Sequence, residues 1–180
     1  MEFIDMLKKR RSIRQYTKEA VTGEQLQLVI NAGLLSPSSR SIRPWELIVV
    51  QNKDTLQKMS ECRVGSAKML ANASAAVVVI ANAEKSDVWT EDCSIVMSNM
   101  HLMADSLGVG SCWIQGRLRT ATTADSGTAS VTTEDYVREC LDFPEGYKLE
   151  AILSLGMPAE EKTPAELSKL PFEKIHYEKF

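Results

Sequence analysis

Seven consecutive apolar residues, from Ala75 to Ala81, place the strongest constraint on how this chain can fold. The run has the length of a strand, and valine and isoleucine fill its middle. Because neither face of such a strand offers a polar side chain to water, we expect a central strand that is covered on both faces. The run is far shorter than the ~20 apolar residues of a membrane-spanning helix, so no membrane partner is expected.

Helical and strand-like patterns alternate along the rest of the chain. The predicted strands cover residues 45–50, 75–81, 111–116 and 149–155. The predicted helices cover residues 3–9, 53–61, 65–73, 87–107 and 133–140. A further helix is predicted to begin at a capping box of Thr22 and Gln25 and to stop at Ser36. In the longest helix, Val96, Met100, Met103 and Leu107 share a face, and we interpret its methionines as core rather than as a binding stripe. Helices interleaved with strands favour an α/β or α+β fold.

The end of the chain differs in character from the rest. A length of 180 residues predicts one domain. We divide this domain into a body, residues 1–156, and a C-terminal arm, residues 157–180. Prolines in the arm prevent one long helix. Its apolar residues are too many for a free tail: Leu167, Leu170, Phe172, Ile175, Tyr177 and Phe180. We therefore predict an extended arm that packs on this subunit or on a partner.

Charge and composition exclude several classes of function. Twenty-one basic and 24 acidic residues give a net charge of −3, which disfavours a general nucleic-acid binder. The four cysteines lie far apart and there are only two histidines, so neither a disulfide framework nor a metal site is expected. The N-terminus lacks the apolar region of a signal peptide, and we expect a cytoplasmic protein with reduced, mostly buried thiols.

Two polar segments are candidates for ligand binding. Arg10-Arg11-Ser12-Ile13-Arg14 offers three guanidinium groups and a hydroxyl, which suit a phosphate, although a solvated charge run is the alternative. Residues 36–45 form a stiff loop of hydroxyl residues and prolines, which either hydrogen-bonds the edge of a ring or merely connects a helix to a strand. Gly108-Val109-Gly110 is not a dinucleotide-binding loop, because it follows a helix and precedes a strand, the reverse of the required order.

Taken in order, the segments of this chain resemble those of the FMN-dependent nitroreductase family over nearly its whole length. The resemblance rests on RRSIR near residue 10, on SPSS followed by PW before the first strand, and on LGVGSCWIQG after the longest helix. FPEGY, a strand that ends in Leu155-Gly156-Met157-Pro158, and SKLP in the arm complete the series. Each motif is modestly specific, but their shared order makes the resemblance strong.

The resemblance implies an α+β fold of three layers, with a mainly antiparallel central sheet flanked by helices and an extended C-terminal arm. It implies a homodimer that binds FMN at the subunit interface, with the arm wrapped around the partner. The implied activity is a ping-pong cycle in which NAD(P)H reduces FMN and the reduced flavin then reduces a nitroaromatic compound, a quinone or a similar small-molecule acceptor. The flavin carries such chemistry, and no catalytic side chain is obligatory.

The resemblance also assigns residues to FMN. The segment that holds the phosphate and part of the flavin edge is matched by Arg10, Arg11, Ser12 and Arg14, and Lys169 matches a basic residue that reaches the phosphate from the C-terminal segment. Pro37, Ser38 and Ser39 match a loop that the other subunit places on the ring. Lys68 matches a lysine near the pyrimidine, and the segment whose main chain approaches flavin N5 is matched by Ile114, Gln115 and Gly116.

Four positions depart from the family pattern. Ser41 and Arg43 stand in the ring-contacting loop where relatives commonly carry Asn and Gln, so one amide contact is lost and one cation is gained. Gly65 replaces an asparagine that binds the pyrimidine in some relatives, and Leu167 replaces a second basic phosphate contact. Two alternatives stay open: a non-enzymatic flavin-binding or flavin-storing dimer, and a dedicated flavin-dependent reductase of another substrate. Loop 120–132 is either a lid over the site or a surface excursion.

Overall fold

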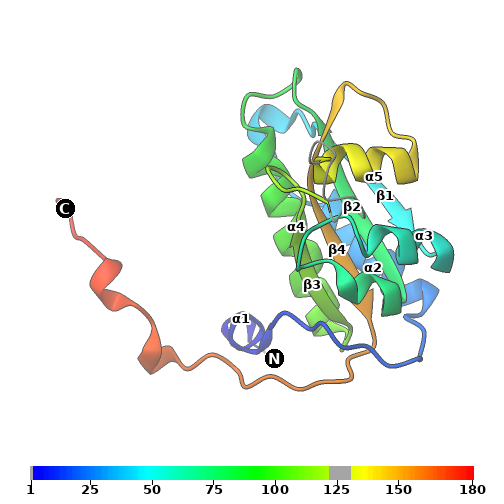
Figure 1. Ribbon diagram of the computed structural model, residues 1–180. Helices are drawn as coiled ribbons and strands as arrows, with labels where there is room; N and C mark the ends of the chain where they lie inside the picture. Colours follow the sequence, from blue (N-terminus) through cyan, green and yellow to red (C-terminus); the bar gives the residue numbers. More distant parts are fainter. Residues whose placement is uncertain (1, 122–130) are drawn as a thin grey trace.

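The computed structural model describes residues 2–121 and 131–180 (Figure 1). Its helices are α1 (Phe3–Lys9), α2 (Gly23–Leu34), α3 (Lys53–Met59), α4 (Trp89–Ser106) and α5 (Thr133–Leu141), with 3₁₀ turns η1 (Ser39–Ser41), η2 (Lys68–Asn72), η3 (Leu167–Lys169) and η4 (Phe172–Lys174). Its strands are β1 (Trp45–Val50), β2 (Ala75–Asn82), β3 (Gly110–Gln115) and β4 (Tyr147–Gly156). The fold is α+β, as predicted. Most of loop 120–132 lies outside the described residues.

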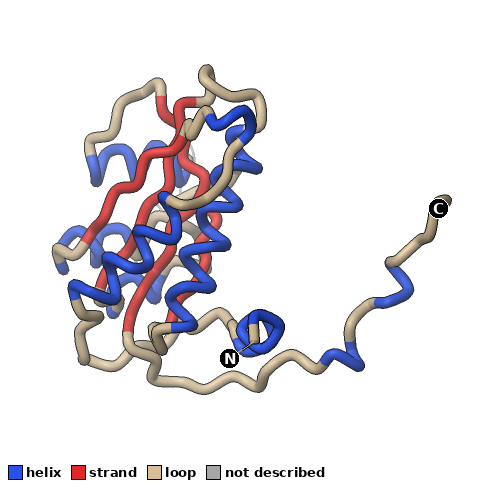
Figure 2. The backbone as a smooth tube through the Cα atoms, turned by 180° about the vertical axis from the view of Figure 1, so that it is seen from behind, coloured by secondary structure: helices blue, strands red, loops and turns tan. Residues whose placement is uncertain are grey.

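The four strands form an antiparallel sheet in the order β1-β2-β4-β3. The apolar run lies in β2, an inner strand that is covered on both faces, so this prediction is confirmed. Val77 and Val79 pack in a core with residues of α2 and α4, whereas Val78 and Ile80 face the opposite core, which α3, η2 and α5 complete. Figures 1 and 2 show these helical layers on the two sides of the sheet.

Helix α4 is the longest element and fills much of the core on its side of the sheet. Val96 and Met100 are fully buried, and Met103 and Leu107 pack at the border of the same cluster, which confirms that the methionines are core residues. Helix α2 packs on α4 at Gly33, where an added Cβ would lie 2.9 Å from Cγ of Met100. A larger residue at this position would displace that methionine from a close-packed core.

One predicted helix is replaced by a short turn, and the bounds of several other elements move by one or two residues. Residues 65–73 do not form a full helix: Gly65 has a φ of 70°, which breaks the helical path, and only the turn η2 follows it. Strand β4 begins at Tyr147 and is longer than predicted, because a bulge between Leu149 and Ala151 lets the strand continue with Glu150 as its extra residue.

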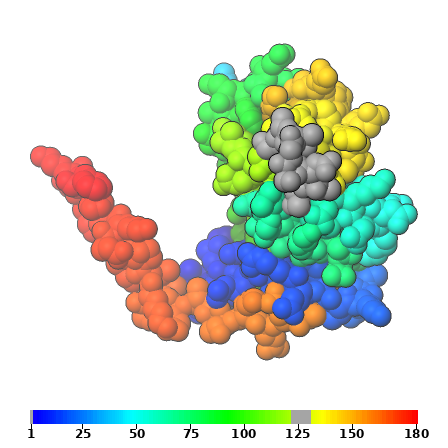
Figure 3. All heavy atoms as spheres, viewed as in Figure 1, coloured from blue at the N-terminus to red at the C-terminus, as the bar shows by residue number. Residues whose placement is uncertain are grey.

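The chain after β4 first packs on its own subunit and then leaves it. Main-chain hydrogen bonds join Thr17 to Met157 at 2.8 Å and Ala165 to Lys8 at 2.8 Å. Beyond Ala165 the arm extends away from the body (Figures 1 and 3). Its six large apolar side chains are all exposed, from Leu170 at 43% to Phe180, the last residue, whose ring stacks on His176 of the arm itself with the ring centroids 4.3 Å apart.

The cysteines of the chain are free, and three of the four are buried. Burial raises the pKa of Cys62 and of Cys93 to about 12, so both thiols stay protonated at neutral pH. No helix among residues 2–121 and 131–180 is both long enough and apolar enough to cross a bilayer. Over the same residues, His, Cys, Asp and Glu side chains form no group of three that could hold a metal ion.

Replacing Leu153 with Ala tests how much the buried sheet contributes to stability. Leu153 lies in β4 and is fully buried, so the cavity left by Leu153→Ala should lower the free energy of unfolding by about 2–5 kcal/mol. Leu28 on the outer side of α2 is 37% exposed, and Leu28→Ala should cost less than about 1 kcal/mol. Urea denaturation at one protein concentration measures both variants. Equal losses would show that the sheet interior is not the main source of stability.

Candidate functional site

The basic segment, residues 10–14, runs from the end of α1 along the outer edge of β3. Ser12 forms a parallel bridge with Ser111, and Ile13 N–H donates to the main-chain oxygen of Ser111 at 2.9 Å. The Ile13 side chain covers Gly110, where an added Cβ would lie 2.8 Å from Ile13 Cγ2. The edge of β3 therefore fixes the path of the basic segment.

Arg10 turns toward helix α4. Its Nη1 lies 2.8 Å from Nε2 of His101, and Nδ1 of His101 lies 2.5 Å from Oγ of Ser111. Burial, with a smaller effect of the Arg10 charge, lowers the pKa of His101 to about 4, so the ring is neutral at neutral pH. A guanidinium can only donate, so Nε2 accepts from Arg10 and the proton on Nδ1 is donated to Ser111.

A cavity of about 340 Å³ opens beside the basic segment and is lined in part by Arg10, Ser12 and His101. The Arg10 guanidinium and the Ser12 hydroxyl are thereby offered to an anion such as phosphate. On β3, burial raises the pKa of the Cys112 thiol, and the positive charges of Arg14, Arg63 and Arg10 act in the opposite direction.

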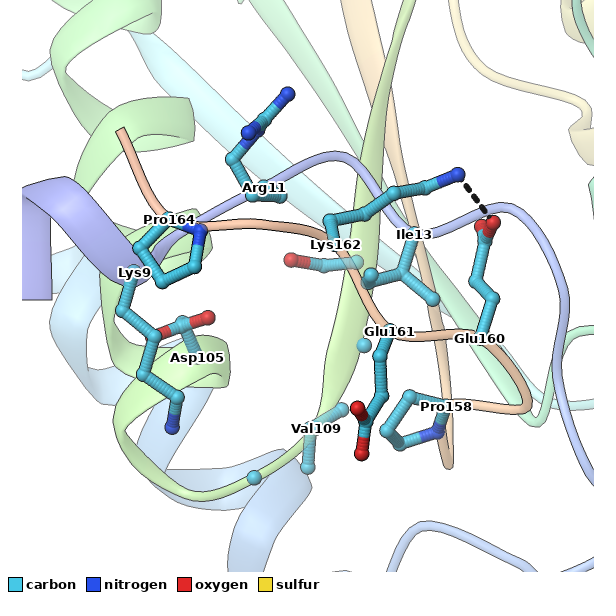
Figure 4. Close-up of a pocket in the computed structure, with 13 residues that line it drawn as sticks. Lys9, Arg11, Ile13, Asp105, Val109, Pro158, Glu160, Glu161, Lys162 and Pro164 are labelled. Atoms are coloured by element: carbon cyan, nitrogen blue, oxygen red, sulfur yellow. Dashed lines mark ion pairs between the residues drawn. The ribbon is translucent and has the colours of Figure 1, made fainter. Parts of the chain in front are cut away.

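Arg11 points away from this cavity. Its Nη1 donates to the main-chain oxygen of Thr163, at the start of the arm. Figure 4 shows Arg11 at a second cavity, of about 390 Å³, that lies between the basic segment and the arm and carries the ion pair of Lys162 and Glu160 (2.5 Å). Arg11 therefore ties the arm to the body, which the sequence did not indicate.

Beyond Ser111 the outer edge of β3 is open among the described residues. Ile13 N–H donates to the main-chain oxygen of Ser111, so the N–H and C=O of Ser111 point away from β4. Main-chain groups alternate in direction along an antiparallel strand, so the N–H and C=O of Trp113 and Gln115 also point away from β4. The Gln115 side chain accepts from Trp113 Nε1–H at 2.9 Å and donates to the main-chain oxygen of Glu150 at 3.2 Å. The N–H of Gln115 is thus a donor held at an open edge.

The residues on either side of Gln115 stiffen the end of β3. Ile114 is fully buried in the sheet. Gly116 N–H donates to the Glu150 oxygen at 3.0 Å, and an added Cβ at Gly116 would lie 2.5 Å from Leu149 Cδ2. Burial raises the pKa of the Glu150 carboxyl, whose Oε2 has no hydrogen-bond partner among the described residues.

The loop between α2 and β1 is held on helix α4. Ser39 N–H donates to Oδ1 of Asp92 at 2.8 Å, and Ser86 Oγ donates to the other oxygen of this buried carboxylate at 3.3 Å. Asn99 Nδ2 donates to Oγ of Ser36 at 2.8 Å. Both α4 residues lie on one flank of the helix, so α4 determines where the loop stands.

The tip of this loop is strained and exposed. Arg40, Ser41 and Arg43 have positive φ angles of 52°, 55° and 50°, a conformation that costs a non-glycine residue roughly 1–2 kcal/mol. Ser38 Oγ accepts from the N–H of Arg43 at 2.9 Å, which closes the loop on itself. The side chains of Pro37, Ser41 and Arg43 face solvent in one subunit.

The basic segment and the loop contact opposite flanks of α4. His101 lies nine residues after Asp92, which corresponds to a rotation of about 180° around the helix and a rise of about 14 Å along it. A single chain therefore does not bring these two groups of predicted contacts together on one ligand.

The two lysines predicted to contact the cofactor are paired with acids. Lys68 contacts Glu61, and its side chain is 66% exposed. Lys169 lies 2.7 Å from Glu166 in the extended part of the arm, away from the body (Figure 1). Among the described contacts, neither lysine reaches Arg10 or Ser12 within one subunit.

The sequence did not single out two residues that organise this site, Asp92 and His101. Asp92 and His101 carried a usable signal, because each falls among the buried residues of the α4 periodicity, where a charged or titratable side chain requires a partner.

Comparisons with known proteins agree with one another. The Nitroreductase family model matches residues 7–68 and 61–157. A protein of Archaeoglobus fulgidus with the provisional name NADH dehydrogenase/NAD(P)H nitroreductase is 35% identical over 99% of each chain. The structure of an FMN-dependent nitroreductase from Clostridium difficile is 44% identical, covers 99% of this chain and 100% of its own, and superimposes with a TM-score of 0.92.

Asp92→Ala tests whether α4 holds the loop. The change leaves the Ser39 N–H without its buried acceptor and should lower the free energy of unfolding by about 1–3 kcal/mol. Amide hydrogen exchange at Ser39 should become faster. Asp87→Ala removes only an exposed ion pair with Arg40 and should cost less than about 1 kcal/mol. Unchanged exchange at Ser39 in Asp92→Ala would mean that other contacts hold the loop.

Proposed function

This chain belongs to the nitroreductase family, and we propose that it is an FMN-dependent oxidoreductase that passes electrons from NAD(P)H to a small acceptor. The proposed acceptors are nitroaromatic compounds, quinones and similar molecules, reduced in a ping-pong cycle. The observation that carries the proposal is Arg10, which His101 holds beside the Ser12 hydroxyl at a cavity next to the open edge of β3.

The residues at this cavity fit the anionic end of FMN. Arg10 and the Ser12 hydroxyl would bind the phosphate, because guanidinium groups and hydroxyls form charge-assisted bonds with its oxygens. Arg14 follows in the same segment, and we propose it as a further cation near the flavin. A positive charge close to the ring would favour the negative charge that a flavin gains on reduction.

The end of β3 fits the ring. Gln115 N–H would donate to the flavin near N5, and the buried Ile114 and the packed Gly116 keep this donor in place. When bound, FMN supplies the centre that accepts and releases hydride. The chain itself therefore binds and orients, and we assign no acid or base to it.

Two subunits are needed to complete this site. The loop that carries Pro37, Ser38 and Ser39 and the segment that carries Arg10 lie on opposite flanks of α4, so a loop from a second copy would cover the ring. Apolar surface supports such a homodimer: helix α1 has no buried residue, and Phe3, Ile4 and Leu7 on it and Ile95 on α4 are exposed.

The remaining predicted contacts are consistent with a homodimer. The arm beyond Ala165 would cover its apolar side chains on the partner, and this would bring Lys169 away from Glu166 to a phosphate. We keep Lys68, Ser41 and Arg43 as proposed neighbours of the ring, since the first lies at the start of η2 and the other two at the exposed tip of the loop.

The function is tested by colour and turnover. The purified protein should absorb near about 450 nm if it contains flavin. Anaerobic mixing with NADH or NADPH should bleach this band, and adding a quinone or a nitroaromatic compound should restore it. Bound flavin without bleaching would favour a storage protein, and bleaching without reoxidation by these acceptors would favour a dedicated reductase.

Replacing Arg10 or Arg14 with Ala should weaken FMN binding. A charge-assisted bond is worth ~1.5–3 kcal/mol, so the dissociation constant should rise roughly ten- to a hundredfold. Lys85→Ala is the matched control, because this cation lies in an exposed turn after β2. Flavin fluorescence titration of the apoprotein measures the affinity. Affinities equal to the parent in both arginine variants would refute the phosphate assignment.

Deleting residues 166–180 should destabilise the dimer. The deletion spares residues 157–165, whose hydrogen bonds lie within the subunit, and removes the exposed apolar part of the arm. Light scattering after gel filtration should show a shift from dimer toward monomer at micromolar concentration, together with loss of FMN. A truncated protein that stays dimeric and keeps its flavin would show that this part of the arm is dispensable.

A further inference from the structure

We propose that His101 is a positioning residue that orients Arg10 toward the FMN phosphate and thereby makes the site prefer FMN to riboflavin. This inference rests on the proposed function, because it concerns how the same site recognises the phosphate. It adds a residue that contacts neither the ring nor, by our assignment, the phosphate itself.

His101 stands where three elements meet. It belongs to α4, its Nε2 accepts from Arg10 of the basic segment at 2.8 Å, and its Nδ1 lies 2.5 Å from Ser111 Oγ of β3. The side chain is 6% exposed. Because both ring nitrogens are used, the ring can neither rotate nor flip without losing a buried hydrogen bond. His101 thus holds Arg10 at a fixed position relative to β3.

This contact leaves Arg10 able to bind an anion. A guanidinium has five N–H donors in a planar fork, and His101 occupies Nη1. The other donors stay available beside the cavity that Arg10 and Ser12 line. An arginine side chain that is already oriented loses less conformational entropy when phosphate binds.

The charges around His101 keep the ring in the accepting form. Arg10 contacts the His101 ring directly, and Lys9 precedes Arg10 in the chain. Asp105 lies one turn after His101 along α4. A protonated ring could not accept from a guanidinium and would repel it. Burial and the adjacent Arg10 both favour the neutral ring. A leucine in place of His101 would fill the same space but could not accept a hydrogen bond from Arg10. The hydrogen bond therefore distinguishes a positioning role from a space-filling one.

Substitutions of His101 that keep a polar atom at only one of the two ring-nitrogen positions separate the positioning role from the space-filling role. Glutamine can place Oε1 where Nε2 stands and accept from Arg10, whereas asparagine reaches only the position of Nδ1, and leucine keeps only bulk. For each apoprotein, FMN and riboflavin are titrated by fluorescence, and circular dichroism confirms folding. His101→Leu and His101→Asn should bind FMN about tenfold more weakly. Their riboflavin affinity should change less than about twofold, since riboflavin has no phosphate. His101→Gln should keep most of the FMN affinity.

The same titrations in an Arg10→Ala background complete the test. If His101 acts through Arg10, His101→Leu should cause no further loss of FMN affinity there. Equal losses for FMN and riboflavin, additive losses with Arg10→Ala, or no rescue by glutamine would each overturn the inference while leaving the proposed function intact. A parent protein that binds neither flavin would overturn the proposed function and this inference with it. If His101→Leu does not fold, the contrast between the glutamine and asparagine variants decides.

Discussion

The burial of strand β2 on both faces is the constraint on which the rest of the structure depends. With no polar side chain among its first seven residues, β2 requires a strand on each side and helices above and below. Helix α4 meets this requirement on one face of the sheet. Because its inward side is committed to the core through Met97 and Met100, only its flanks and its outer surface remain to carry polar function.

Those flanks organise the candidate site. Asp92 and Asn99 hold the loop before β1 on one flank, and His101 holds Arg10 on the other. The outer surface between them carries Ile95, which is exposed in one subunit. One helix thus separates the two groups of proposed ligand contacts and presents apolar surface between them. In the homodimer that we propose, dimerisation and FMN binding would depend on the same contact. This is the strongest structural reason to expect neither without the other.

Local patterns predicted the fold better than they predicted the site. The apolar run, the capping box of Thr22 and Gln25 and the α4 periodicity each concern neighbours in sequence, and the structure confirms all three. The boundaries moved where a glycine or a bulge intervened. Within the basic segment, the pattern could not show that Arg11 turns to the arm whereas Arg10 turns to His101, because partners 91 and 152 residues away decide it. Side-chain direction is a tertiary property even when residue identity suggests the ligand.

Strand β3 sets the direction of the site. At about 3.3 Å per residue, Ser111 and Gln115 lie about 13 Å apart along one edge. Ser111 anchors His101, and through it the phosphate end, whereas Gln115 offers its N–H at the other end. The bulge at Glu150 fixes where that edge stops, since the Glu150 oxygen accepts from Gln115 Nε2 and from Gly116 N–H. The FMN orientation that we propose therefore follows β3, with the phosphate toward Arg10 and the ring toward Gln115. The buried Glu150 carboxyl, whose pKa is raised by burial, lies at the proposed ring end of this edge.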